Sequence, residues 1–152
     1  MYDCSRRHMK KACVLFGFGC SRSEVESARL VEYLKKNRWH LTRDLRDAEL
    51  ILLGTCGVTR LIEDLGMALV STASRKRRRG AKIVVFGCMP AMNEKRLREN
   101  FEVITLTPST MGRLDDILGS AVRMEEIGDP NELDSYSGLM KESFSARDRL
   151  GV

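Results

Sequence analysis

Three cysteines occupy the most chemically informative positions in this 152-residue sequence. Cys20, Cys56 and Cys88 each follow a short apolar run closely, and each precedes a segment with helical periodicity. The tripeptide Phe-Gly-Cys occurs twice, at residues 18–20 and 86–88. Thiolates are soft ligands that bind zinc and iron–sulfur clusters. The repeated placement therefore predicts a metal or cluster site formed by these three residues.

Apolar runs alternate with helical segments about five times along the chain. Runs without polar alternation are typical of strands buried on both faces. We expect strands at 12–16, 39–42, 50–53, 82–86 and 103–106, and helices at 21–36, 59–78, 91–100 and 110–122. This order predicts an α/β fold, a three-layer flavodoxin-like or Rossmann-like domain with a mainly parallel five-stranded sheet.

Such a sheet would bring the three cysteines together. In the flavodoxin-like order 2-1-3-4-5, the strands that precede Cys20, Cys56 and Cys88 are neighbours, about 4.8 Å apart. The helices that follow would place their amino-terminal amides beside the thiolates, which favours negative charge. Three thiolates leave one iron of a [4Fe–4S] cluster without a protein ligand.

Simpler interpretations stay open at this point. A single cysteine at a strand end is often a small buried hydrophobe. A zinc site is an alternative, although His8 and His40 lie elsewhere in the sequence and no fourth cysteine is nearby. The cysteine count of five is odd, which does not favour a disulfide framework. We expect Cys13, inside the first strand, to belong to the core.

The net charge of +5 permits an anionic partner without requiring one. Much of the excess lies in the run Arg75–Arg79, which could contact RNA phosphates. A solvated helix end, where cations complement the helix dipole, is the simpler interpretation.

The distribution of apolar residues indicates the domain organisation and the location of the protein. No window approaches the roughly 18 apolar residues of a membrane helix, and the apolar stretch 12–18 is short for a signal peptide. We therefore expect a cytoplasmic protein without a membrane partner. Residues 1–10 are interpreted as an extension, 11–123 as the iron–sulfur domain, and 124–152 as a tail or docking segment.

Residues 11–122 resemble the N-terminal domain of the radical-SAM methylthiotransferases, which modify tRNA adenosines or a ribosomal protein aspartate. The matching stretches are Phe18-Gly19-Cys20 with Glu26-Ser27, residues 47–58, and Val85-Phe86-Gly87-Cys88-Met89. The resemblance implies that Cys20, Cys56 and Cys88 bind an auxiliary [4Fe–4S] cluster. Its open iron would hold the sulfur species to be transferred.

The sequence also departs from that family. Gly54 and Ser23 stand where members usually or often have asparagine. No C-x-x-x-C-x-x-C spacing occurs, so the resemblance implies no cluster here that cleaves S-adenosylmethionine and no binding of that molecule by this chain alone. The RNA-binding barrel common in the family is missing too. We expect either a stand-alone protein with a separate radical-SAM partner or an excised domain, acting on RNA or protein.

The leading hypothesis is an iron–sulfur component of a methylthiotransferase or sulfurtransferase system, and not a complete radical-SAM enzyme. One alternative is a non-catalytic docking, scaffold or electron-transfer module with the same fold. Another alternative is an RNA-binding accessory domain.

Overall fold

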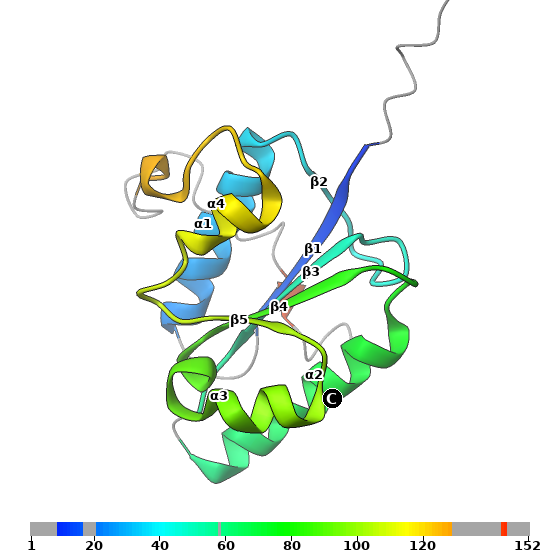
Figure 1. The fold of residues 1–152 in the computed structure, drawn as a ribbon, viewed down its shortest axis with the longest axis vertical. Coiled ribbons are helices and arrows are strands. Elements are labelled where there is room, and N and C mark those ends of the chain that lie inside the picture. Colours follow the sequence, from blue (N-terminus) through cyan, green and yellow to red (C-terminus); the bar gives the residue numbers. More distant parts are fainter. Residues whose placement is uncertain (1–8, 17–20, 58, 129–143, 146–152) are drawn as a thin grey trace, which may run out of the picture.

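The computed structural model describes residues 9–16, 21–57, 59–128 and 144–145, and Figure 1 shows their arrangement. Strands and helices alternate along the chain as predicted. The elements are β1 (Lys11–Phe16), α1 (Ser21–Lys36), β2 (His40–Leu41), β3 (Leu50–Thr55), α2 (Arg60–Lys76), β4 (Lys82–Gly87), α3 (Cys88–Asn100), β5 (Ile104–Leu106), α4 (Arg113–Leu118), a 3-10 turn (Met124–Glu126) and β6 (Phe144–Ser145).

The strands form one parallel sheet in the order β2-β1-β3-β4-β5, and β6 pairs with β1 beside this path. This arrangement confirms the predicted α/β fold and its five-stranded order. The helices lie on both faces of the sheet, α1 and α4 on one and α2 and α3 on the other (Figure 1). In the described part of the chain, no helix has the length and apolar character needed to cross a membrane.

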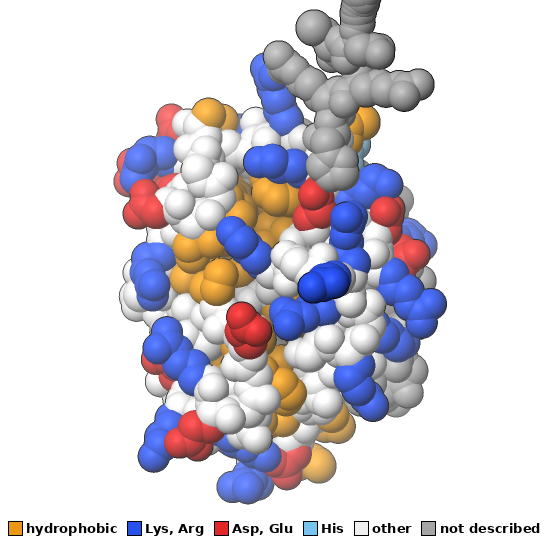
Figure 2. All heavy atoms as spheres, turned by 45° about the vertical axis from the view of Figure 1, so that its right-hand side comes forward, with side chains coloured by type: hydrophobic (Ala, Val, Ile, Leu, Met, Phe, Trp, Pro, Cys, Tyr) orange, Lys and Arg blue, Asp and Glu red, His pale blue; other side chains and the backbone are white. Residues whose placement is uncertain are grey.

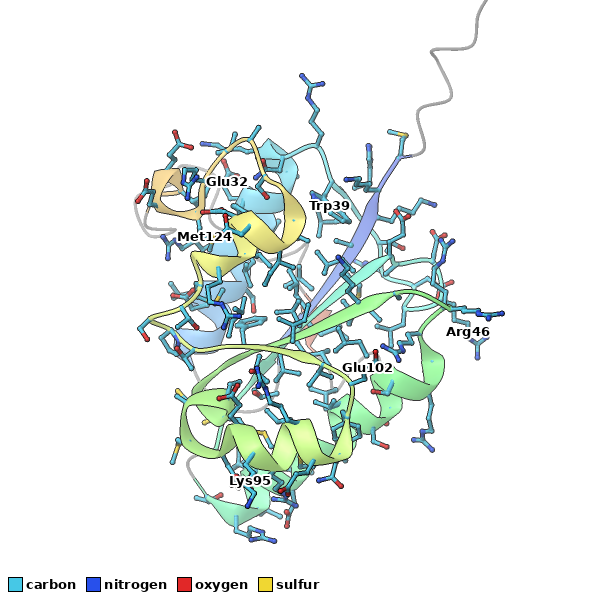
Figure 3. The ribbon with its side chains drawn as sticks, viewed as in Figure 1. Glu32, Trp39, Arg46, Lys95, Glu102 and Met124 are labelled. Atoms are coloured by element: carbon cyan, nitrogen blue, oxygen red, sulfur yellow. The ribbon has the colours of Figure 1, made fainter. Side chains whose placement is uncertain are left out.

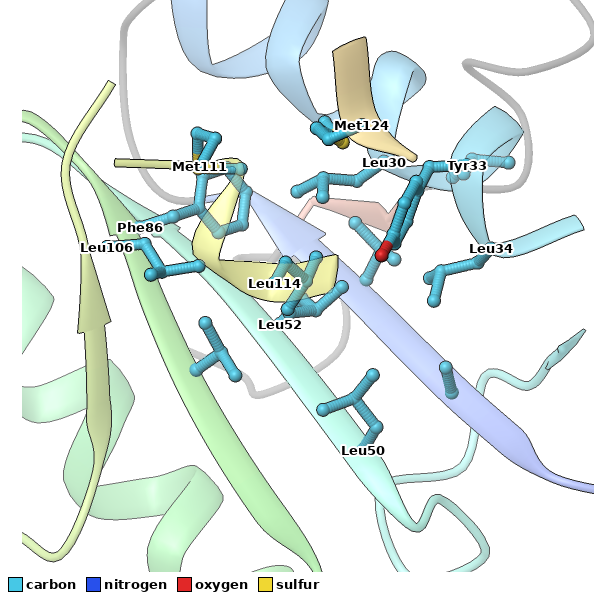
Figure 4. Packing of buried hydrophobic residues seen from close by; sticks show 14 of the residues in the cluster. Leu30, Tyr33, Leu34, Leu50, Leu52, Phe86, Leu106, Met111, Leu114 and Met124 are labelled. Atoms are coloured by element: carbon cyan, nitrogen blue, oxygen red, sulfur yellow. The ribbon is translucent and has the colours of Figure 1, made fainter. Parts of the chain in front are cut away.

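Two hydrophobic layers hold the helices to the sheet. Alternate residues of each central strand point to opposite faces, as strand geometry requires. On β3, Leu50 and Leu52 pack toward α1 and α4, whereas Ile51 and Leu53 pack toward α2 and α3. Figure 4 shows the first layer close up. Cys13 is fully buried in the second layer, which confirms its predicted place in the core.

Helix boundaries differ from the prediction most at α3 and α4, and α4 is shorter than predicted at both ends. α3 begins at Cys88 and not at residue 91, but Asn93 leaves helical geometry with φ −150° and ψ 58°. Helical spacing over residues 91–100 predicts that Met92 faces inward. This prediction is wrong, because the helix is interrupted next to Met92 and its side chain is 61% exposed. α4 ends at Leu118, because Gly119 adopts the left-handed conformation (φ 62°) that terminates helices.

A buried polar group joins α1 to α4. The Tyr33 hydroxyl donates to the Asp115 carboxylate at 2.9 Å and lies 2.5 Å from the Ser120 hydroxyl. The other described donor to that carboxylate oxygen is the backbone N–H of Met124, at 2.9 Å. Burial raises the pKa of Tyr33 above its usual value, and Asp115 raises it further, against the opposing effect of Ser120. The neutral phenol is therefore the form that the fold stabilises.

Replacing Tyr33 by Phe should lower the free energy of unfolding by about 1–2 kcal/mol at neutral pH, because Asp115 loses a buried donor. Since the folded pKa is raised, the contribution of Tyr33 ionisation is complete below about pH 10 and declines above it, where the unfolded tyrosine ionises. Urea unfolding at pH 8 and pH 10.5 measures both effects. An identical alkaline loss of stability in the variant would contradict this assignment.

Candidate metal centre

Cys56 and Cys88 follow the two central strands at the same level. The register of β3 and β4 pairs Thr55 with Gly87, and each cysteine is the next residue in the chain. Both therefore lie at the carboxyl edge of the sheet, where α2 and α3 begin (Figure 1). This is the edge at which open parallel sheets bind ligands.

Backbone contacts on both sides of the cysteines keep the two chain segments together. A Cβ placed on Gly87 would lie 2.4 Å from the Thr55 carbonyl oxygen, and one on Gly57 would lie 3.3 Å from the Met89 Cα. The residues immediately before and after Cys56 thus approach the residues immediately before and after Cys88. The structure brings these two predicted ligands together.

Local geometry explains why the approach needs glycine at residue 87. Gly87 has φ 104° and ψ −156°, a region that is essentially closed to residues with a side chain. The neighbouring Thr55 hydroxyl donates to the Phe86 carbonyl at 3.1 Å, which ties the two strand ends together. Gly87 thus provides the sharp turn that a glycine before a cysteine allows.

Met89 fills the space beneath the two strand ends. Its side chain is fully buried, and its sulfur would lie 3.0 Å from a Cβ on Gly66 of α2. Because Gly57 and Gly66 both lack side chains, the start of α3 packs tightly against the β3–α2 connection. Met89 therefore fills core space.

The surroundings of the two thiols suit anionic sulfur. Cys56 is buried, with 7% of the residue exposed, whereas Cys88 is partly exposed. Cys88 is the first residue of α3, and Gly87 has no side chain to cover the first amides of the helix. The residues of that first turn, all described, include no acidic side chain. The N–H groups of a helix start favour negative charge nearby, and here the first turn is short because Asn93 leaves helical geometry.

The third predicted ligand, Cys20, lies outside the described residues, as does Cys4. Among the residues that the structure does describe, no three Cys, His, Asp or Glu side chains form a group that could hold a metal ion. The thiols of Cys56 and Cys88 match the ligand preference of an iron–sulfur cluster, and the backbones that carry them lie side by side. In their chemistry, these two described residues fit that cofactor.

A buried carboxylate lies on the helix that follows Cys20. The Oε2 atom of Glu26 is buried and, within the described part of the molecule, has no hydrogen-bond partner. An unpaired buried acceptor is costly, by about 1–3 kcal/mol. Glu26 belongs to one of the stretches that resemble the methylthiotransferases.

Sequence reasoning did not identify a polar network between α2 and α3. The Arg96 guanidinium donates to Glu63 at 2.5 Å and to Asp64 at 2.6 Å, and the Asn93 amide donates to Glu63 at 2.9 Å. Hydrogen bonds from Arg96 lower the pKa of both carboxyl groups. The partners are about 30 residues apart in sequence, so helical spacing gave no signal for these contacts.

The basic run lies at the other edge of the sheet. Arg75 and Lys76 end α2, where their charge complements the helix dipole, and Arg78 and Arg79 are exposed. Figure 2 shows many Lys and Arg side chains on this side of the molecule. In Figure 3, Trp39 and Arg46 lie toward this edge, whereas Lys95 lies on α3 at the other end. The basic run is therefore separate from the cysteine pair.

Comparison with known proteins shows the family to which the chain belongs. Residues 12–108 match the model of a family described as "Uncharacterized protein family UPF0004". A tRNA-2-methylthio-N(6)-dimethylallyladenosine synthase of Anaeromyxobacter sp. (strain K) is 35% identical over 121 residues, which are 78% of this chain and 26% of that protein. A ribosomal protein uS12 methylthiotransferase RimO of Prosthecochloris aestuarii is 26% identical over 125 residues, 80% of this chain and 29% of that protein.

A second RimO, from Saccharopolyspora erythraea, is 25% identical over 158 residues, 97% of this chain and 31% of that protein. Because the family model covers more than half of the chain, the protein belongs to this family, the N-terminal domain of the methylthiotransferases. The chain spans between about a quarter and a third of the length of these relatives. The family predicted from the cysteine-containing stretches is confirmed.

Replacing Gly87 by Ala should lower the free energy of unfolding by about 3 kcal/mol, because strain and a clash with the Thr55 carbonyl act together. Gly112→Ala is the matched control, since Gly112 has φ −62° and no atom within 4 Å of its Cβ position. We expect that variant to differ by less than about 0.5 kcal/mol. Chemical denaturation measures both, and equal stability of the two variants would contradict the described approach.

Dibromobimane, which joins two thiols that are close together, should cross-link Cys56 to Cys88 in the reduced, cofactor-free protein. The expectation follows from the backbone contacts on both sides of the pair. Cys4→Ser and Cys20→Ser substitutions remove competing thiols, and buried Cys13 serves as an internal control. Peptide mass mapping identifies the linked residues. Mono-labelled Cys56 and Cys88 without a cross-link would show that the thiols are apart.

Proposed function

We propose that this chain is the auxiliary iron–sulfur domain of a methylthiotransferase system. Cys20, Cys56 and Cys88 would hold a [4Fe–4S] cluster with one open iron, to which a sulfur-containing cosubstrate binds for transfer. The observation that supports this proposal most directly is that Cys56 and Cys88 directly follow the ends of neighbouring strands, with close backbone contact before and after each residue. Membership of the family supports the same role.

The chain's own residues would hold and shield the site. Thr55 and Gly87 keep the ends of β3 and β4 in contact, so the backbone segments that carry the two cysteines stay side by side. Met89, the residue after Cys88, is fully buried. The backbone N–H groups of Cys88 and Met89 would favour negative charge at Cys88, as helix N-termini do for anions. When bound, the cluster would supply an iron that carries sulfur to be transferred.

The radical chemistry would be carried out by residues that this chain does not contain. Its five cysteines contain no C-x-x-x-C-x-x-C arrangement to hold a second cluster. A separate radical-SAM protein, or further domains such as the relatives' greater length allows, would therefore cleave S-adenosylmethionine. The names of the relatives indicate tRNA and ribosomal protein as the classes of substrate to test, and a cytoplasmic location suits both.

Anaerobic reconstitution should give a brown protein with broad visible absorption and about four irons per chain. Alanine at Cys20, Cys56 and Cys88 together should abolish the colour, because thiolates supply the ligands. Iron analysis and visible spectroscopy measure the result. Cys4→Ala and Cys13→Ala are the controls and should retain the cluster.

An iron without a thiolate ligand leads to a further prediction. Sulfide or methanethiol added to the reduced protein should change its electron paramagnetic resonance signal, because an exogenous ligand alters the iron that lacks a thiolate. A signal unaffected by either compound would favour the electron-transfer or scaffold alternative. If the unsubstituted chain binds no cluster after reconstitution, the proposed function as a whole is overturned.

A further inference from the structure

The network of Glu63, Asn93 and Arg96 joins the two helices that follow the cysteines of the described site. Asn93 lies five residues after Cys88, and α2 begins four residues after Cys56. Arg96 contacts both Glu63 and Asp64 of α2, whereas the Asn93 amide donates to Glu63. The network therefore connects the two helix starts to each other directly.

Asn93 makes this connection from a non-helical backbone conformation. Its φ of −150° and ψ of 58° interrupt α3, and the break separates the turn that starts at Cys88 from the rest of the helix. The Asn93 side-chain oxygen accepts a hydrogen bond from the Arg96 backbone N–H at 3.3 Å. One side chain thus bridges the break and reaches α2, so the network can fix the orientation of the first turn.

The side chains of this network are more enclosed than those of the other ion pairs on α3. The Glu63 side chain is 12% exposed and that of Arg96 is 25% exposed. In the Arg98–Glu94 pair, by contrast, the two side chains are 59% and 46% exposed. Exposed pairs of that kind contribute little to stability or geometry, whereas enclosed, forked contacts are more specific. Arg98 is therefore a suitable comparison on the same helix.

We propose that Glu63, Asn93 and Arg96 are positioning residues that hold Cys88 within reach of Cys56. The proposal rests on the proposed function only for its consequence at the cluster, because the positioning itself is a property of the cofactor-free chain. Gly57, Gly66 and Met89 set how closely α3 packs, and the polar network sets how its first turn is oriented. Loss of the network should leave the sheet intact but let Cys88 move away from Cys56.

Cross-linking of the cofactor-free protein by dibromobimane tests the positioning without any metal. In chains that carry Cys4→Ser and Cys20→Ser, the cross-linking rate should fall between about threefold and tenfold with Asn93→Gly or Arg96→Gln. Glu63→Ala should have a similar effect, whereas Glu63→Gln keeps an oxygen acceptor and should recover most of the rate. Arg98→Ala is the matched control and should react at the unsubstituted rate.

Reconstituted chains with Cys20 retained give a second readout. Asn93→Gly and Arg96→Gln should bind less iron per chain and show an altered electron paramagnetic resonance signal, and Arg98→Ala should show neither change. Circular dichroism measures whether each variant remains folded. If the Asn93 and Arg96 variants unfold, the comparison of Glu63→Ala with Glu63→Gln tests the positioning role. Equal cross-linking rates in that pair would overturn the positioning role. Failure of the native chain to bind a cluster would instead overturn the proposed function and leave the cross-linking result standing.

Discussion

The contact between the ends of β3 and β4 is the constraint on which the site depends. Thr55 and Gly87 pair in register, and their backbones approach so closely that residue 87 has no room for a Cβ. The next residue in each strand is a cysteine, so the geometry of the sheet is passed directly to the two thiols. Parallel pairing thus brings together two cysteines that are 32 residues apart in the sequence.

The two hydrophobic layers make that contact rigid. Residues of β3 are buried at every position, which anchors the strand on both faces at once. α2 and α3 cover the face that includes Cys13 and Met89, and their amino ends lie at the cysteine edge. Packing, helix direction and ligand placement therefore follow from one arrangement of alternating elements, as expected for a doubly covered parallel sheet.

Much of this arrangement was predictable from sequence, because apolar runs and glycines identify buried strands and the turns after them. The strand order and the meeting of Cys56 with Cys88 follow from that pattern together with the rules for parallel sheets. The inward orientation of Met92 was wrong, since periodicity assumes an unbroken helix and Asn93 interrupts it. The contacts of Arg96 were not foreseen, because long-range side-chain pairs leave no periodic signal. The role of Cys20 stays a prediction, since it lies outside the described residues.

The free edge of β1 is shared by two short strands. β2 pairs with its beginning, at Lys11 and Ala12, and β6 pairs with its end, at Leu15 and Phe16. An uncovered edge of such an apolar strand exposes unpaired backbone N–H and C=O groups, which can pair with another polypeptide chain and promote self-association. Phe144 and Ser145 therefore cover the part of this edge that β2 leaves without a partner. Shortened versions of the protein that stop before it would need another way to cover this edge.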